Sequence, residues 1–410
     1  MRYSIIILLL LGIVACSKPN PTPSFEKKLI ESGLSEEELQ DKILGMLVGS
    51  AIGDAMGAPT EMWPREMIQS KYGFVQKLDS MTRKASPEGT WLPNLPAGGT
   101  TDDTRWKVLT AEFLQTQGPE QLEPKAFAQL IVDQHSFYFE EYSKIDPNDS
   151  LLKGKALLKV EWLQEWAKVS QPYITNNLNG YADSLGKFYG GEMVCAGLLY
   201  GAALGSYFPG NPKNAYEETY KLSLYDLGYA KDLTALSAAM TAAGMEKGAN
   251  ADSLLASLKV DPKQYVESRL VGRTANRIIW EAQSIANEAK SLDSLGNQMD
   301  PESPALKFAY SQLDARIQDM PFHAGEIFLQ TLTAMLYTDF DFMNTLIFLT
   351  NYGRDNDTTA ALAGAILGAY YGFEALPEKE KQQVMIVNKK LLGIDLLETS
   401  RSLSNHLSGK

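Results

Sequence analysis

Basic residues are scarce in this 410-residue chain, which has 38 Lys and Arg against 50 Asp and Glu and a net charge of −12. Such an acidic chain binds phosphate backbones poorly, so we expect no nucleic-acid partner. Sulfur and imidazole ligands are also scarce, since there are two Cys, three His and no His-Glu-x-x-His sequence. This shortage argues against a structural zinc site. It also leaves the folded part of the chain with no internal disulfide.

The sequence also lacks the apolar–polar alternation that is typical of β-strands. Apolar and polar residues show no clear two-residue alternation over a strand's length, and no Asn-Gly turn lies between strand-like runs. Helical spacing is present almost throughout, beginning with a capping box of Ser35 and Glu38. Hydrophobic residues make up 44% of the chain, enough for a large core. We therefore predict an all-α fold, a compact multi-helix domain over residues 30–400.

The N-terminus has the composition of an export signal. Arg2 precedes an apolar run over residues 5–15, which is too short for a spanning helix of about 20 residues. The segment Ile13-Val14-Ala15-Cys16 resembles the lipobox of bacterial lipoproteins. We therefore predict a signal peptide over residues 1–15 and a lipidated Cys16; ordinary cleavage near Ala15 is the alternative.

Residues 16–29 are rich in Pro and would form an extended tether between the lipid and the folded domain. The prediction places the protein in a bacterial cell envelope, outside the cytoplasm and anchored to a membrane through its lipid.

Glycines recur every fourth residue in three segments. The rows are Gly45, Gly49, Gly53 and Gly57; Gly197, Gly201 and Gly205; and Gly364, Gly368 and Gly372. Glycine inside a helix costs about 0.5–1 kcal/mol relative to Ala, so these rows require a structural reason. Four-residue spacing puts each row on one helix face, where the missing side chains let helices approach closely. We predict that these three helices form the tightly packed centre of the domain.

Two short acidic segments carry the candidate chemistry. They comprise Thr101, Asp102 and Asp103, and Asp355, Asp357 and Thr358, and each lies directly before a helix-like run. Clustered carboxylates are costly to bury unless a cation lies among them, and oxygen ligands favour Mg²⁺ or Mn²⁺, followed by Ca²⁺. Helix capping is the alternative for either segment alone. Capping needs only one such residue, so two segments with three each favour a shared metal site.

The order of the motifs resembles the ADP-ribosylglycohydrolase family, which includes the dinitrogenase-reductase-activating glycohydrolase and the ADP-ribose-acceptor hydrolases. The similarity extends from about residue 40 to residue 375. Its motifs are Gly53-Asp54-Ala55-Met56-Gly57-Ala58-Pro59-Thr60-Glu61, Thr101-Asp102-Asp103-Thr104, Gly353-Arg354-Asp355-Asn356-Asp357-Thr358 and the glycine row from Gly364 to Gly372.

The resemblance implies an all-α domain with two Mg²⁺ (or Mn²⁺) ions in a central cleft, and hydrolysis of the glycosidic bond of an ADP-ribosyl group on a protein side chain or small acceptor. Thr101, Asp102 and Asp103 would bind metal from one side, and Asp355, Asp357 and Thr358 from the other. Glu61 matches an acidic residue at the ribose. Either Glu61 or Asp103 would assist the attacking water, and the sequence does not separate them.

One motif departs from the family pattern. Many members have an Asn-Gly-rich segment ending in Met-Arg near the substrate, and the matching residues here are Gly190, Gly191, Glu192 and Met193, followed by Val194 in place of Arg. These four residues are candidates for substrate binding, or they form only a turn before a core helix. The departure keeps two alternatives open: hydrolysis of another ribosyl metabolite, or a non-catalytic protein on the same scaffold.

Several other residues near the motifs have both a structural and a functional interpretation. We expect His135 and His323 to be structural, with His323 the better functional candidate, and Cys195 to be a buried, inert thiol. Trp91, Trp106, Tyr189 and Tyr352 are candidates for stacking on adenine, although core packing is the commoner role of such residues.

Overall fold

The computed structural model describes residues 25–84, 89–259, 275–292 and 299–410. The predicted signal peptide, Cys16 and the first part of the tether lie outside these residues. Residues 25–29, which the sequence analysis included in the tether, belong to the first helix. The last helix ends at Leu407, beyond the predicted domain limit at residue 400.

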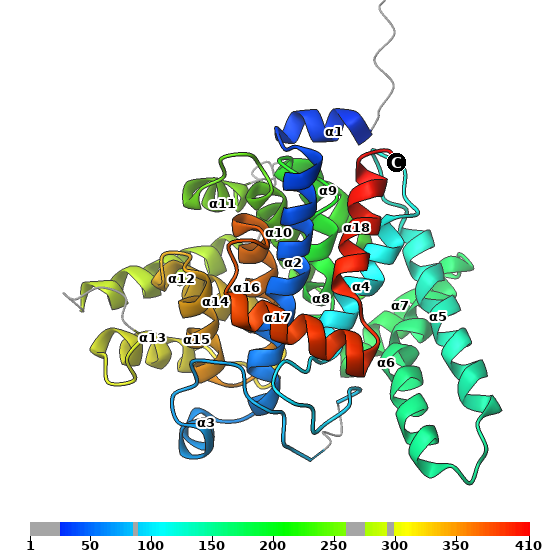
Figure 1. The fold of residues 1–410 in the computed structure, drawn as a ribbon, viewed down its shortest axis with the longest axis horizontal. Helices are drawn as coiled ribbons and strands as arrows, with labels where there is room; N and C mark the ends of the chain where they lie inside the picture. The colour runs from blue at the N-terminus through cyan, green and yellow to red at the C-terminus, as the bar shows by residue number, and fades with distance from the viewer. Residues whose placement is uncertain (1–24, 85–88, 260–274, 293–298) are drawn as a thin grey trace, which may run out of the picture.

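The described residues form eighteen α-helices and no strand, with only isolated β-bridges between loops, so the all-α prediction is confirmed (Figure 1). The helices are α1 (Phe25–Ser32), α2 (Glu36–Gly57), α3 (Arg65–Tyr72), α4 (Asp102–Leu114), α5 (Pro124–Lys144), α6 (Ser150–Ile174), α7 (Leu178–Lys187), α8 (Leu198–Gly205), α9 (Pro212–Leu222), α10 (Ala230–Gly244), α11 (Ala251–Ser257), α12 (Ala275–Ser291), α13 (Pro304–Asp314), α14 (Ala324–Tyr337), α15 (Phe342–Tyr352), α16 (Asn356–Tyr371), α17 (Glu378–Val387) and α18 (Leu396–Leu407).

Helices α2 and α16 pack against each other at the centre of the fold, in antiparallel register (Figure 1). A Cβ atom added to Gly45 would lie 2.3 Å from the carbonyl oxygen of Gly368, and one added to Gly49 equally close to that of Gly364. No real side chain tolerates such distances, so the two backbones are in direct contact. The close approach predicted from glycine spacing is confirmed for this pair.

The third glycine row, in α8, does not pack against the glycine rows of α2 and α16. An added Cβ at Gly201 would lie 2.5 Å from Ser237 Oγ, and one at Gly205 would lie 2.3 Å from the carbonyl oxygen of Ala238. Helix α8 therefore uses its glycines to approach α10. The sequence predicted a single centre of three glycine-bearing helices. The structure has instead two close helix pairs, α2 with α16 and α8 with α10.

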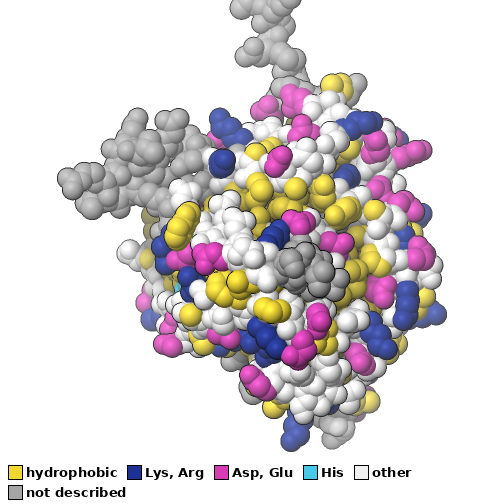
Figure 2. Space-filling model, turned by 90° about the vertical axis from the view of Figure 1, so that its left-hand side faces the viewer, with side chains coloured by type: hydrophobic (Ala, Val, Ile, Leu, Met, Phe, Trp, Pro, Cys, Tyr) yellow, Lys and Arg dark blue, Asp and Glu magenta, His cyan; other side chains and the backbone are white. Residues whose placement is uncertain are grey.

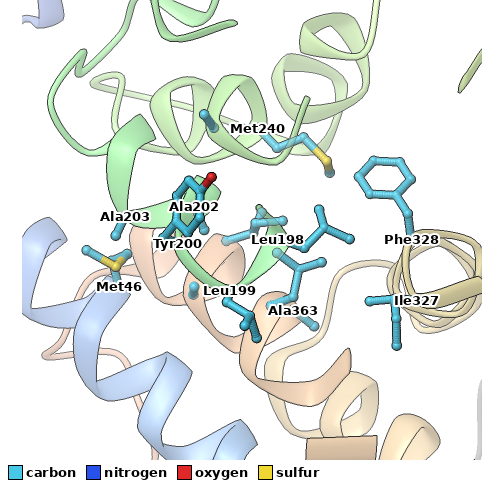
Figure 3. Close-up of a cluster of buried hydrophobic side chains, with 14 of the residues drawn as sticks. Met46, Leu198, Leu199, Tyr200, Ala202, Ala203, Met240, Ile327, Phe328 and Ala363 are labelled. Carbon is cyan, nitrogen blue, oxygen red and sulfur yellow. The ribbon is translucent and has the colours of Figure 1, made fainter. Parts of the chain in front are cut away.

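Apolar side chains from these four helices and α14 meet in one core. Figure 3 shows Met46 of α2, Tyr200 of α8, Met240 of α10, Phe328 of α14 and Ala363 of α16 converging. On the face shown in Figure 2, Lys and Arg are interspersed with Asp and Glu rather than gathered in one patch.

Helix α2 with the short turn after it, through Thr60, has the length and apolar composition of a membrane span, and is the one such segment among the described residues. Its most apolar stretch is entirely buried inside the protein. A core helix passes the same test of length and composition, so the segment is explained by its position in the fold.

Because α2 and α16 are in direct contact, we expect one added methyl group between them to lower the stability of the protein. Gly368→Ala would place Cβ 2.0 Å from the carbonyl oxygen of Gly45, and overpacking of this kind costs about 1–3 kcal/mol. Gly154→Ala in α6 is the matched control, because its Cβ would meet open space and should add about 0.5–1 kcal/mol. Denaturant unfolding measures both; a Gly368→Ala protein as stable as the parent would contradict the direct backbone contact.

Candidate metal-binding active site

The two acidic segments form the N-terminal ends of α4 and α16 and meet in the folded protein. The hydroxyl of Thr358 donates a hydrogen bond to Asp103 Oδ2 at 3.0 Å, across 255 residues of sequence. Asp103, Asp355, Asp357 and Thr358 are buried. The structure thus brings the predicted ligands of both segments into one place.

Glu61 joins this cluster from the loop after α2. Glu61, Asp355 and Asp357 each offer a carboxylate oxygen, and the three oxygens lie within 4.8 Å of one another. A backbone bridge fixes Glu61 beside the second segment, because Met62 N donates to the Arg354 carbonyl at 2.7 Å. Three buried carboxylates at this spacing form a set of hard oxygen ligands.

The cluster is electrostatically unfavourable as it stands. Burial, followed by repulsion from Asp357, raises the pKa of Glu61 well above its usual value. Burial and repulsion from neighbouring carboxylates likewise raise the pKa values of Asp355 and Asp357. In addition, Asp357 Oδ1 is buried and has no hydrogen-bond partner. A divalent cation would offset this repulsion and satisfy the unpartnered oxygen, so the donor set fits Mg²⁺ or Mn²⁺.

Helix capping accounts for one of the predicted ligands. Thr101 is the N-cap of α4, and its hydroxyl accepts a hydrogen bond from Asp103 N at 3.3 Å. Asp355 holds the same position on α16 but makes no side-chain capping bond. Asp102 lies in the first turn of α4, where burial raises its pKa and Arg105 opposes that shift. Capping therefore explains Thr101 and leaves the two aspartates of α16 unexplained.

Two basic side chains in the cluster were missed by the sequence analysis. Lys107 is buried and donates to Asp103 Oδ1 at 2.8 Å. Arg83 donates to Glu61 Oε2 at 3.1 Å. The four-residue spacing of Asp103 and Lys107 on a helix could have revealed the first pair. Arg83 lies in a loop with no periodicity, so nothing in the sequence indicated the second.

Asp54 is a third missed residue, although it lies within the quoted Gly53–Glu61 motif. Its carboxylate, fully buried in the last turn of α2, accepts hydrogen bonds from the backbone N–H groups of Thr101 and Thr104 at 2.9 and 3.0 Å and from the Thr104 hydroxyl at 2.6 Å. Burial, with repulsion from Asp103, raises its pKa to about 7. Asp54 thereby joins α2 to the start of α4.

A pocket opens over the carboxylates. It is lined by Glu61, Met62, Trp91, Asp102, Asp103, Trp166, Tyr189, Val194, Cys195, Ala196, Leu199, Phe322, Asp355, Asp357 and Thr358. A larger cleft of about 300 Å³ lies beside α3 and α13 but contains none of these acids. Because the acidic cluster carries the chemistry, we place the candidate site at the smaller pocket.

The candidate substrate-binding segment lies at the edge of this pocket. Gly190, Gly191 and Glu192 are exposed, Met193 is partly buried, and the pocket is lined by the flanking Tyr189 and Val194 instead. The segment is attached to α14, since Met193 O accepts the backbone N–H of Ala324 at 2.9 Å.

The remaining candidates divide between pocket and core. His323 caps α14 by accepting hydrogen bonds from Gly325 N and Glu326 N at Nδ1, and burial lowers its pKa. His135, on α5, is partly buried, and burial also lowers its pKa. The rings of Trp106 and Tyr352 are buried in the core, whereas Trp91 and Tyr189 line the pocket.

Cys195 is buried in the pocket wall, with Sγ 4.0 Å from Asp355 Oδ2. Burial, and then the nearby Asp355 carboxylate, raise the pKa of its thiol, which keeps it protonated and unreactive.

Comparison with known proteins agrees with these motifs. The ADP-ribosylglycohydrolase family model matches residues 35–405. The chain belongs to the ADP-ribosylglycohydrolase family. The family name denotes glycosidic hydrolysis, which supports hydrolase activity in general, and the resemblance inferred from the motifs is confirmed.

Individual relatives are distant. The chain is 22% identical to the uncharacterized protein YegU of Escherichia coli over 360 residues, covering 85% of this chain and 93% of that protein. It is 32% identical over 80 residues to the ADP-ribosyl-[dinitrogen reductase] glycohydrolase of Rhodospirillum rubrum, covering 20% and 24% of the two chains. A solved structure described as an ADP-ribosylglycohydrolase-related protein complex is 20% identical, with a TM-score of 0.52 and coverage of 91% and 99%, and shares the fold.

The buried pair of Lys107 and Asp103 predicts a large loss of stability in Lys107→Met. The substitution leaves Asp103 buried without its cation, which costs about 3–5 kcal/mol. Lys168→Met is the matched control: its partner Glu165 is exposed, and such pairs contribute about 0–1 kcal/mol. Urea unfolding of the metal-free protein measures both. Equal stability of the two variants would show that the ion pair with Lys107 does not stabilise the burial of Asp103.

Proposed function

We propose that this protein is a divalent-metal-dependent glycosidase. It hydrolyses the bond between C1 of a ribosyl group and its leaving group, in an ADP-ribosyl conjugate on a protein side chain or small acceptor, or in a related ribosyl compound. The observation that carries the proposal is the convergence of Glu61, Asp355 and Asp357, with an unpartnered buried oxygen on Asp357. Membership of a glycohydrolase family supplies the reaction class.

The residues proposed to hold two Mg²⁺ or Mn²⁺ ions are those of the two acidic segments: Thr101, Asp102, Asp103, Asp355, Asp357 and Thr358. When bound, such ions supply positive charge and Lewis acidity for orienting a sugar diol and a water molecule. The surplus of carboxylates over the basic partners Lys107 and Arg83 supports this assignment.

Hydrogen bonding favours Glu61 over Asp103 as the group that assists the water. Both oxygens of Asp103 are engaged, Oδ1 by Lys107 and Oδ2 by Thr358. Arg83 engages Oε2 of Glu61, which leaves Oε1 to accept a proton. Burial and repulsion from Asp357 raise the pKa of Glu61, which makes its carboxylate a stronger base. The surrounding carboxylates would stabilise positive charge that develops at C1 as the bond breaks.

The proposal extends to location. A signal peptide over residues 1–15 and a lipid on Cys16 would hold the enzyme outside the cytoplasm, where its substrates are extracytoplasmic ribosyl compounds. Incorporation of labelled palmitate into the parent protein and not into Cys16→Ala tests the anchor.

Metal dependence can be tested by thermal unfolding of the metal-stripped protein. We expect Mg²⁺ or Mn²⁺ to raise the melting temperature of the parent, because binding to the folded state alone stabilises it. Asp357→Asn should abolish the shift, whereas Asp133→Asn, an exposed acid of α5, should retain it. If neither cation changes the melting temperature of the parent protein, both the metal site and the proposed mechanism are wrong.

Catalysis can be tested with ADP-ribosyl-arginine, ADP-ribosyl-serine and simpler ribosides. Glu61→Gln should lower kcat by about 10²–10⁴-fold, the usual contribution of a general base, while the Asp133→Asn control keeps parental turnover. Release of the leaving group, followed by chromatography, is the measurement. If Glu61→Gln turns over substrate as fast as the parent, Glu61 is not the group that accepts the proton.

A further inference from the structure

The pocket over the carboxylates has an acidic floor and an aromatic wall. Trp91, Trp166, Tyr189 and Phe322 line it together with the carboxylates of Glu61 and the two acidic segments. No Lys, Arg or His is among the described residues that line it. A diphosphate entering this pocket would meet acids and aromatic faces, with no cationic side chain among the described lining residues to replace its hydration.

The basic side chains near the cluster are directed to other partners. Arg105, beside Asp102, donates to the carbonyl oxygen of Thr90 at 2.7 Å. Arg83 is paired with Glu61, and Lys107 is buried against Asp103. Arg354 forms a two-pronged pair with Glu326, at 2.8 and 2.9 Å. None of the four lines the pocket, so recruiting one to a phosphate would break an existing ion pair or, for Arg105, a hydrogen bond.

Two helix N-termini at the pocket are also occupied. Helix N-termini commonly bind phosphate through free backbone N–H groups. At α4, Asp54 accepts the N–H groups of Thr101 and Thr104. At α8, the buried carboxylate of Asp226 accepts the N–H of Gly197 at 2.7 Å. The chain's own carboxylates therefore take these positions at α4 and α8. A third N-terminus, that of α16, has no side-chain cap, but it begins among the carboxylates of Glu61, Asp355 and Asp357, which would repel a phosphate.

Tyr189 has a backbone conformation that a non-glycine residue adopts only under constraint. Its φ is +46° and its ψ +42°, and Gly190 and Gly191 after it also have positive φ. The residue is 45% exposed, and its ring lies edge-on to that of Phe322, with centroids 5.6 Å apart. Such strain is found at binding sites more often than elsewhere. Here it holds a partly exposed aromatic face beside the pocket.

We infer that the preferred substrate is a ribosyl glycoside of a planar heteroaromatic base that carries no phosphate. The inference rests on the proposed glycosidase function and narrows its substrate class. In the reaction, a water oxygen bonds to C1 as the C1–N bond breaks. The bonding electron pair leaves with the base nitrogen, and the attacking water loses a proton. A base that leaves as an anion takes up this proton, whereas for a pyridinium such as nicotinamide, which leaves neutral, the proton passes through Glu61 to solvent; the products are ribose and the free base. The aromatic wall stacks on the base, and the carboxylate floor faces the sugar.

Three compounds with the same glycosidic bond test the inference: nicotinamide riboside, its mononucleotide and the dinucleotide NAD. Nicotinamide release gives kcat/KM for the full-length protein with Mg²⁺, using both anomers of each compound. We expect kcat/KM for the riboside to exceed that for the mononucleotide by at least tenfold, with NAD lower still. Calorimetric binding to the slow variant Glu61→Gln should rank the three compounds in the same order.

Substitution of the aromatic wall supplies the control pair. Trp91→Leu should weaken riboside binding at least fivefold, since stacking on an aromatic side chain contributes this much or more. Trp280→Leu, at an exposed position of α12, should leave binding unchanged. Equal or better turnover of NAD would overturn the inference while upholding the glycosidase. If no compound is hydrolysed, the glycosidase proposal fails, but the calorimetric ranking still tests the inference. Tightest binding of the riboside supports the inference. Any other order of affinities, or no binding at all, overturns it.

Discussion

The direct backbone contact between α2 and α16 is the constraint on which the rest of the structure depends. The register set by Gly45, Gly49 and their partners continues to Gly57, where an added Cβ would lie 2.4 Å from the backbone of Asp357. The end of α2 therefore lies on the start of α16. Asp54, in that last turn, caps α4, and Glu61 follows within one short loop. One helix contact thus positions all three parts of the site.

This architecture concentrates negative charge where water is excluded. Lys107 and Arg83 each neutralise one carboxylate, but Asp355 and Asp357 have no basic partner among the ion pairs of the described residues. Their pKa values rise because ionisation is unfavourable without a counter-charge. A fold that keeps such a cluster carries a cost in stability, which a bound cation would remove. The same buried carboxylates that make up the candidate site therefore also lower the stability of the fold.

The helical fold and the close α2–α16 packing could be predicted because helical periodicity and glycine spacing are local patterns. The meeting of Asp103 with Thr358 was inferred from chemistry, since two clusters of oxygen ligands make sense only together. The roles of Arg83 and Asp54 could not be predicted, because each depends on a contact that exists only after folding. The glycines of α8 were expected in one centre with those of α2 and α16 but approach α10 instead, because spacing indicates a close approach and does not identify the neighbouring helix.

Anomalous X-ray scattering from crystals grown with Mn²⁺ tests the central claim most directly. The account predicts two anomalous peaks between the carboxylates of Asp102 and Asp103 and those of Asp355 and Asp357, and their loss in Asp357→Asn crystals. Crystals saturated with Mn²⁺ that show no peak among these carboxylates would contradict it and leave the acidic segments with a structural role alone.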